Sequence, residues 1–268
     1  MEVICFYNRK GGPGKTTSTV NIGGCLSKLH NKKVLIVDSD PQCNCTDFLF
    51  ASTGTEPKAT LETYLRDKNT DLDDIIYPIT FRISEDKEPV LTNIDLIPAS
   101  PHMDGIENFD IMLLKELLMS VADNYDYCLI DCTPYLSPCT LAAFCASKWI
   151  VTVAEPDVDS VGGYSLLIDT INNVKEKGYN DTLELLGIYM NKVHTVDVIG
   201  NFILDSFKKG AGDSIFKSYV RYARIMKQMR YFGIPASYYA PSSNMAKDYE
   251  KLTNEIIERI EKIRRGSK

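Results

Sequence analysis

The sequence lacks the features of a membrane-spanning, secreted or metal-clustering protein. No run approaches the ~20 apolar residues of a transmembrane helix, and a charged, glycine-rich stretch interrupts the apolar run after Tyr7, so no secretory signal peptide is expected. Eight cysteines are present, but none forms a Cys-x-x-Cys pair and most lie inside apolar runs. We therefore expect reduced, buried thiols in a cytoplasmic protein, rather than disulfides or a metal site.

The chain also lacks an excess of basic charge and any obvious linker. Its formal net charge is -6, which argues against indiscriminate coating of nucleic acid but leaves room for a local basic patch. With 44% hydrophobic and 25% charged residues, the composition is that of a soluble globular protein. No internal repeat and no stretch rich in Pro, Gly or Ser divides the 268 residues, so we expect one domain spanning 1–268.

What is present is a series of apolar runs of strand length. They are continuous rather than alternating, as expected for strands buried on both faces, and helix-length segments lie between them. The runs cover residues 3–7, 34–37, 94–98, 127–130, 149–153 and 185–190. This alternation predicts an α/β fold with a mainly parallel, twisted sheet and helices on both faces. Residues 51–88 are polar and weakly patterned, and only short helices and loops are expected there.

Residues 8–17 read NRKGGPGKTT and lie between an apolar strand and a helix-length segment, which is the context of a phosphate-binding loop. Lys15 is expected to neutralise the β and γ phosphates of a nucleotide, and the Thr16 hydroxyl to ligate Mg²⁺. The glycines let the backbone approach an anion, and amides at a helix N-terminus point at phosphates. The other nucleotide-binding candidates in the loop are Gly11, Gly12, Gly14 and Thr17.

The loop departs from the general phosphate-loop pattern. Arg9 stands five positions before Gly14, where the pattern has its first glycine, and Pro13 removes one amide donor while its fixed φ stiffens the turn. A second lysine, Lys10, stands inside the loop. These features leave open whether the site is degraded or of a different kind.

Acidic residues end two of the expected strands. Asp131 closes the run YDYCLID, in the manner of a Walker B element, and Asp38 and Asp40 close VLIVDSD. In an open parallel sheet the carboxyl ends of the strands face the ligand crevice. We therefore expect these carboxylates to act on the metal ion and the attacking water.

Together, KGGPGKTT, VLIVDSDPQCNCT and YDYCLIDCTP resemble the three signatures of the ParA/MinD family of deviant Walker A ATPases. The similarity extends to IDLIPAS at 94–100, and Asp-Pro-Gln at 40–42 is the form found in ParA/Soj-type partition ATPases. The resemblance implies a P-loop NTPase fold, weak Mg²⁺-dependent ATP hydrolysis and a homodimer that sandwiches two ATP molecules. It also implies that the loop is of a different kind, because the extra lysine is a signature of the family.

The resemblance assigns roles to individual residues. Lys10 would reach across the dimer to the partner's phosphates, which suits its place at the mouth of its own loop. Asp40 would orient or activate the attacking water and, through water, contact the metal ion. Asp38 would support Asp40 or the metal shell, and Asp131 would hold Mg²⁺ through water.

Adenine recognition and the first helix are less regular. Asn191, after the strand LLGIYMNKV, and Arg221 fit the family's adenine contacts, although a strand-end Asn can also be a simple turn residue. Cys43 stands where the family usually has glycine. Gly23 and Gly24 interrupt the first helix at about 1 kcal/mol each relative to alanine, so we expect close packing against the sheet to compensate.

A basic segment at 206–230 carries seven lysines and arginines, and Asp213 is its only acid. Partition ATPases use this region to bind DNA without sequence preference, and interleaved tyrosines could support such a surface. The DNA-binding candidates are Lys208, Lys209, Lys217, Arg224, Lys227 and Arg230. The alternative is a solvated face whose arginines serve the nucleotide or the dimer interface.

The sequence therefore predicts a partition ATPase that binds DNA as an ATP-bound dimer, is associated with the nucleoid in that state, and segregates plasmid or chromosomal DNA with a ParB-like centromere-binding partner. The phosphate loop starts at residue 9, so no N-terminal helix-turn-helix domain is expected. One alternative is a MinD-like ATPase that cycles on membranes through an amphipathic helix at 252–263, although that isoleucine stripe suits packing on the domain and no stable anchor is expected. Another is an iron-sulfur ATPase that uses Cys139.

Overall fold

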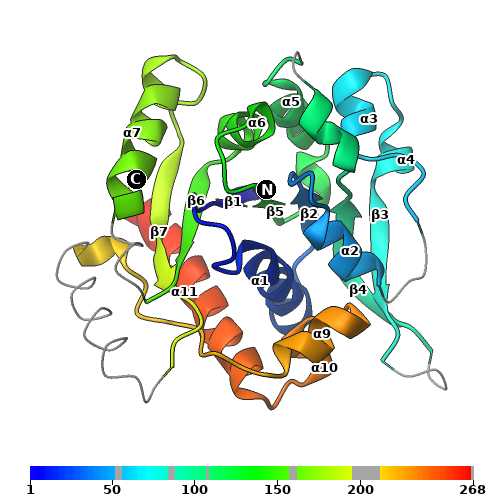
Figure 1. The fold of residues 1–268 in the computed structure, drawn as a ribbon, viewed down its shortest axis with the longest axis vertical. Coiled ribbons are helices and arrows are strands. Elements are labelled where there is room, and N and C mark those ends of the chain that lie inside the picture. Colours follow the sequence, from blue (N-terminus) through cyan, green and yellow to red (C-terminus); the bar gives the residue numbers. More distant parts are fainter. Residues whose placement is uncertain (52–55, 84–87, 107–108, 157–161, 195–211, 267–268) are drawn as a thin grey trace.

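The computed structural model describes residues 1–51, 56–83, 88–106, 109–156, 162–194 and 212–266. Within these residues the strands form one seven-stranded sheet in the order β3-β4-β2-β5-β1-β6-β7 (Figure 1). All pairs are parallel except the antiparallel pair at the β3 edge, which confirms the mainly parallel α/β fold. The strands are β1 (Glu2–Phe6), β2 (Val34–Asp38), β3 (Tyr77–Phe81), β4 (Val90–Ile97), β5 (Tyr127–Asp131), β6 (Trp149–Ala154) and β7 (Glu184–Met190).

Helices cover both faces of the sheet (Figure 1). One core lies between the sheet and α1, α2, α10 and α11, and the other between the sheet and α3, α5, α6 and α7. The α-helices are α1 (Lys15–His30), α2 (Asn44–Phe50), α3 (Leu61–Arg66), α4 (Leu72–Ile75), α5 (Leu113–Ser120), α6 (Pro138–Ala146), α7 (Gly162–Glu176), α9 (Met226–Phe232), α10 (Ala236–Tyr239) and α11 (Asn244–Gly266). Short 3-10 turns occur at Pro101–Gly105, Ala122–Asn124 and Gly212–Ser214.

The strand register brings the expected acidic residues to one edge of the sheet. Asp131 at the end of β5 is paired with Phe6 on one side and with Asp38 on the other. All five residues of β2 and of β5 are buried, which agrees with their continuous apolar sequence. The carboxyl ends of β1, β2 and β5 therefore meet where the phosphate loop leaves β1.

The region for which the sequence gave no assignment contains two short helices and the edge strand β3. This strand carries Pro78, and its burial alternates, because only one face packs on the core. Its antiparallel pairing with β4 slips between Pro78 and Thr80. A short, irregular edge strand of this kind leaves little periodic signal in the sequence.

The isoleucine stripe of α11 packs on the domain, as expected: Ile256 and Ile260 are 0% and 2% exposed. Among the described helices, none has the length and apolar character needed to cross a bilayer. All eight cysteines are buried, which also agrees with expectation.

The two glycines of α1 pack against different neighbours. A Cβ on Gly23 would lie 2.9 Å from Ile36 Cδ1 and 3.5 Å from Leu129 Cδ1, so this glycine does allow close approach to the sheet. A Cβ on Gly24 would instead lie 2.7 Å from Pro235 Cβ and 2.9 Å from Ser237 Oγ. The expectation of sheet packing is therefore right for Gly23 and wrong for Gly24, which faces the segment before α10.

Candidate functional site

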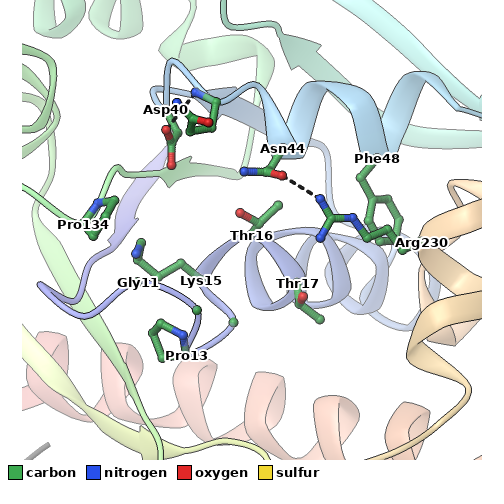
Figure 2. A pocket seen from close by; sticks show the side chains of 13 residues that line it. Gly11, Pro13, Lys15, Thr16, Thr17, Asp40, Asn44, Phe48, Pro134 and Arg230 are labelled. Carbon is green, nitrogen blue, oxygen red and sulfur yellow. Dashed lines mark hydrogen bonds between the residues drawn. The ribbon is translucent and has the colours of Figure 1, made fainter. Parts of the chain in front are cut away.

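The phosphate loop opens onto a cavity of ≈ 290 Å³ at the carboxyl edge of the sheet (Figure 2). Residues 11–17 form one wall, and Asp40, Asn44, Pro134 and Arg230 come from four other parts of the chain. The loop, the acidic edge and one arginine of the basic segment thus share one site.

Glycine is required where the loop enters α1. Gly12 and Gly14 have φ of 87° and 105°, in the left-handed region that favours glycine. A Cβ on Gly14 would lie 2.3 Å from Asn191 Nδ2, which donates a hydrogen bond of 2.7 Å to the Pro13 carbonyl. Asn191, expected near adenine, therefore braces the loop from behind, and this contact engages its amide nitrogen.

Two residues that the sequence reasoning did not single out also hold the loop. Asn8 Oδ1 accepts from the Lys10 amide at 2.9 Å, and Asn8 Nδ2 donates to the Val153 carbonyl at 2.6 Å, so the loop entrance is tied to β6. Lys192 Nζ donates to the Gly12 carbonyl at 2.6 Å and pairs with Glu155. The short polar Asn8 at the end of a strand was a usable signal, whereas nothing in the sequence near Lys192 pointed to the loop.

Lys15 is buried at the centre of the loop. Its Nζ lies 3.3 Å from the Asn8 carbonyl and 3.5 Å from the Lys10 carbonyl. Burial lowers the pKa of Lys15, while the nearby carboxylates of Asp131 and Asp40 oppose that shift. The ammonium group is thus held beside the cavity by groups that a phosphate could replace.

At the acidic edge, Thr16 Oγ1 donates a hydrogen bond of 2.6 Å to Asp131 Oδ2. Asp131 Oδ1 is buried and has no hydrogen-bond partner among the described residues. Burial, with the neighbouring charge of Asp38, raises the pKa of Asp131 well above its usual value. A buried carboxylate oxygen beside a phosphate-loop threonine fits the outer shell of a hydrated Mg²⁺, which would restore the missing partner.

Asp38 is bound within its own loop. Its Oδ2 accepts from the amide and the hydroxyl of Thr46 at 2.8 and 2.7 Å, and its Oδ1 accepts from the Asp40 amide at 3.1 Å. Burial raises the pKa of Asp38 to about 6. These contacts fix the turn between β2 and α2, so Asp38 positions Asp40.

Asp40 lines the cavity. Its Oδ1 accepts from the Gln42 amide at 2.9 Å, and Figure 2 shows the carboxylate on the side of the cavity opposite the loop. Burial raises the pKa of Asp40, while Lys15 opposes the shift. Of the two acids that end VLIVDSD, it is Asp40 that is placed to meet a bound phosphate or its attacking water.

The basic segment does not form one surface in the structure. Arg221, expected near ATP, forms a forked ion pair with Asp248, with Nε–Oδ2 and Nη2–Oδ1 distances of 2.8 and 2.7 Å. Arg230, expected at DNA, lines the phosphate cavity instead. The cations Lys217, Arg224 and Lys227 lie in the described part, where Lys227 and Arg224 are exposed, while Lys208 and Lys209 lie outside the described residues.

A second cavity of ≈ 460 Å³ lies after β7, where the sequence predicts adenine contacts. Its walls include Arg221, Arg224 and His194, whose ring stacks on Tyr222 with centroids 4.9 Å apart and planes 23° apart. A flat aromatic surface next to polar groups can accept a planar base. The cavity adjoins Val193, two residues beyond the Asn191 that braces the loop.

Comparisons with known proteins agree with these features. A family model described as an AAA domain matches residues 1–185. The chain is 32% identical to the sporulation initiation inhibitor protein Soj of Bacillus subtilis, over 95% of this chain and 98% of that protein. It is 30% identical to the chromosome-partitioning ATPase Soj of Treponema pallidum, over 96% of this chain and 98% of that one.

A solved structure of the septum site-determining protein MinD from Pyrococcus horikoshii, complexed with Mg-ADP, matches with a TM-score of 0.73. It is 23% identical, and the match covers 95% of each chain. This likeness shows the same fold, whereas the two Soj proteins are similar in sequence along nearly their whole length.

Proposed function

Because the chain belongs to the ParA/MinD family of ATPases, close to its Soj-type members, and is an ATP hydrolase, we propose that it acts as a single-domain DNA-partition ATPase. The observation that carries the nucleotide part is the acidic edge: Thr16 and Asp131 lie 2.6 Å apart, with a buried oxygen of Asp131 directed at no protein donor among the described residues. That arrangement beside a glycine loop suits a magnesium-bound triphosphate.

In this proposal the loop amides and Lys15 bind the phosphates, with Gly11, Gly12 and Thr17 at their surface. Thr16 and, through water, Asp131 and Asp40 would hold Mg²⁺, which neutralises phosphate charge when bound. Asp40 orients the attacking water, and Asp38 holds the Asp40 turn in place. Lys10, at the outer end of the loop, binds the phosphates of the second protomer in an ATP-bound homodimer.

The DNA part of the proposal relies on the exposed cations. Arg224 and Lys227 are exposed, and Lys217 lies on the same segment, beside the exposed rings of Tyr219 and Tyr222. Such side chains can bind DNA phosphates without reading sequence, and exposed rings can stack on bases. A ParB-like centromere-binding protein would be the partner that stimulates ATP turnover and releases the DNA.

The test measures retention on non-specific DNA with ATP, with ADP and without nucleotide, for the wild type and for Lys15→Ala. We expect DNA retention only with ATP, loss in Lys15→Ala, and an affinity that falls linearly with salt on logarithmic axes. Light scattering should show dimers with ATP and Mg²⁺. Single subunits under these conditions, or retention that ignores nucleotide and salt, would overturn the proposal.

Anionic lipid vesicles provide the control for the membrane-cycling alternative. The burial of Ile256 and Ile260 argues against α11 as an anchor, because its apolar side already packs on the sheet. We therefore expect no ATP-dependent co-sedimentation with vesicles. Vesicle binding without DNA retention would assign the protein to the MinD-like alternative.

A further inference from the structure

Arg230 differs from the other described cations of the basic segment in where its side chain points. It lies in α9, directly after Met229, which is 0% exposed and anchors that helix in the core. From there the side chain extends toward α2, and its Nη2 donates a hydrogen bond of 2.6 Å to Asn44 Oδ1. Figure 2 shows its guanidinium group beside Thr16 and Thr17, across the cavity from Pro134.

The position has the chemistry of a phosphate contact. A guanidinium group has five N–H donors in a planar fork, and the bond to Asn44 uses one of its nitrogens. Arginine binds phosphate oxygens through two parallel hydrogen bonds and keeps its charge at any physiological pH. The same cavity holds the Lys15 ammonium group and the helix N-terminus at Thr16, so a polyphosphate there would face positive charge from two sides.

We propose that Arg230 is a nucleotide-binding residue that holds the phosphates of ATP in its own protomer, and not a DNA contact. This inference depends on the proposed nucleotide site. The guanidinium lies at the Thr16–Thr17 end of the loop rather than at the Lys10 end, so it binds the phosphates that ADP and ATP share. Since Asn44 begins α2, four residues after Asp40, the same side chain links α9 to the turn that carries the water-orienting acid.

The experiment is equilibrium binding of fluorescent ATP and ADP, without DNA, to the wild type and to Arg230→Ala. Losing a charge-assisted contact should weaken both nucleotides by about tenfold. Arg230→Lys keeps the charge but not the fork and should recover part of the loss. Asn44→Ala, which removes only the guanidinium's protein partner, should weaken binding by about two- to threefold.

Lys251→Ala removes an exposed cation from α11, away from the cavity, and is the matched control, with affinities expected to equal those of the wild type. Arg230 is exposed, so thermal unfolding without nucleotide should be unchanged in Arg230→Ala, which separates a binding defect from a folding defect. Normal ATP and ADP affinity in Arg230→Ala, with weaker DNA retention at saturating ATP, would overturn the inference and make Arg230 a DNA contact. A wild type that binds neither nucleotide would instead overturn the proposed function.

Discussion

The phosphate loop at 8–17 and the basic segment at 212–232 were both prominent in the sequence, but the fold treats them differently. The loop keeps its residues together on one wall of one cavity. The cations of the basic segment diverge: Arg221 pairs with Asp248, Arg224 lines the second cavity and Arg230 lines the first. A contiguous run of charge therefore did not make a contiguous surface.

The difference lies in where each residue finds its partner. The loop's geometry depends on backbone angles at Gly12 and Gly14 and on amides of adjacent residues, which the local sequence determines. Arg221 bonds to a residue 27 positions away, and Arg230 to one 186 positions away. The destination of a long, flexible cation is decided by tertiary contacts that no local pattern contains.

The largest expected effect tests the loop's one outward-facing function. Lys10→Ala should lower ATP hydrolysis by about 100-fold, because a lysine that stabilises transferred phosphate charge across a dimer contributes several kcal/mol to the transition state. ATP affinity, measured at concentrations where the protein is monomeric, should stay near that of the wild type. Lys15→Ala is the comparison and should lose both. Equal loss of affinity and hydrolysis in Lys10→Ala would mean that the lysine acts within its own protomer.

The next prediction concerns the basic segment. Arg221→Ala should lower the free energy of unfolding by about 2–3 kcal/mol, because the Asp248 side chain is only 6% exposed and would lose its charged partner. Urea unfolding measures this loss, and Arg221→Ala/Asp248→Ala should recover part of it. Unchanged stability with weaker ATP binding would restore Arg221 to the nucleotide site and weaken the contrast between the two regions.

The contact between the regions can be tested through the two glycines of α1. Gly24→Ala should destabilise the protein by about 1–2 kcal/mol, because its Cβ would lie 2.7 Å from the rigid ring of Pro235, just after α9. Gly23→Ala meets only the mobile end of Ile36, so its gain in helix propensity, about 1 kcal/mol, should offset the crowding. Thermal unfolding compares the two variants, and an equal effect would show that the Pro235 contact is not a constraint.

How much could be read from the sequence follows the same division. The parallel sheet and the acidic edge were predictable, because continuous apolar runs and strand-end acids are local signals, and the register of Asp38 and Asp131 places them together. The edge strand β3 was not, since its alternation is short and broken at Pro78. Nor was the bracing of the loop by Asn191 and Lys192, which depends on β7 ending beside the loop.

The smallest expected effect concerns Asp38, whose hydrogen-bond partners all lie within eight residues, at Asp40 and Thr46. Its buried side chain has a pKa of about 6, above the usual value near 3.9. Between about pH 4 and pH 6 the unfolded chain therefore gives up this proton while the folded chain keeps it. The contribution of Asp38 to the free energy of unfolding is complete below pH 4 and falls as the pH rises to 6.

Asp38→Asn should remove this dependence, so the difference in unfolding free energy between the wild type and the variant should shift by about 1–2 kcal/mol between pH 4 and pH 7. Urea unfolding at unit steps of pH measures it, and Asp126→Asn, at an exposed carboxylate away from the loop, supplies the control with no such slope. A wild type and an Asp38→Asn variant with parallel pH profiles would show that Asp38 is ionised throughout. The local hydrogen bonds of the turn would then outweigh burial, and local contacts would fix the charge state of this region as well as its shape.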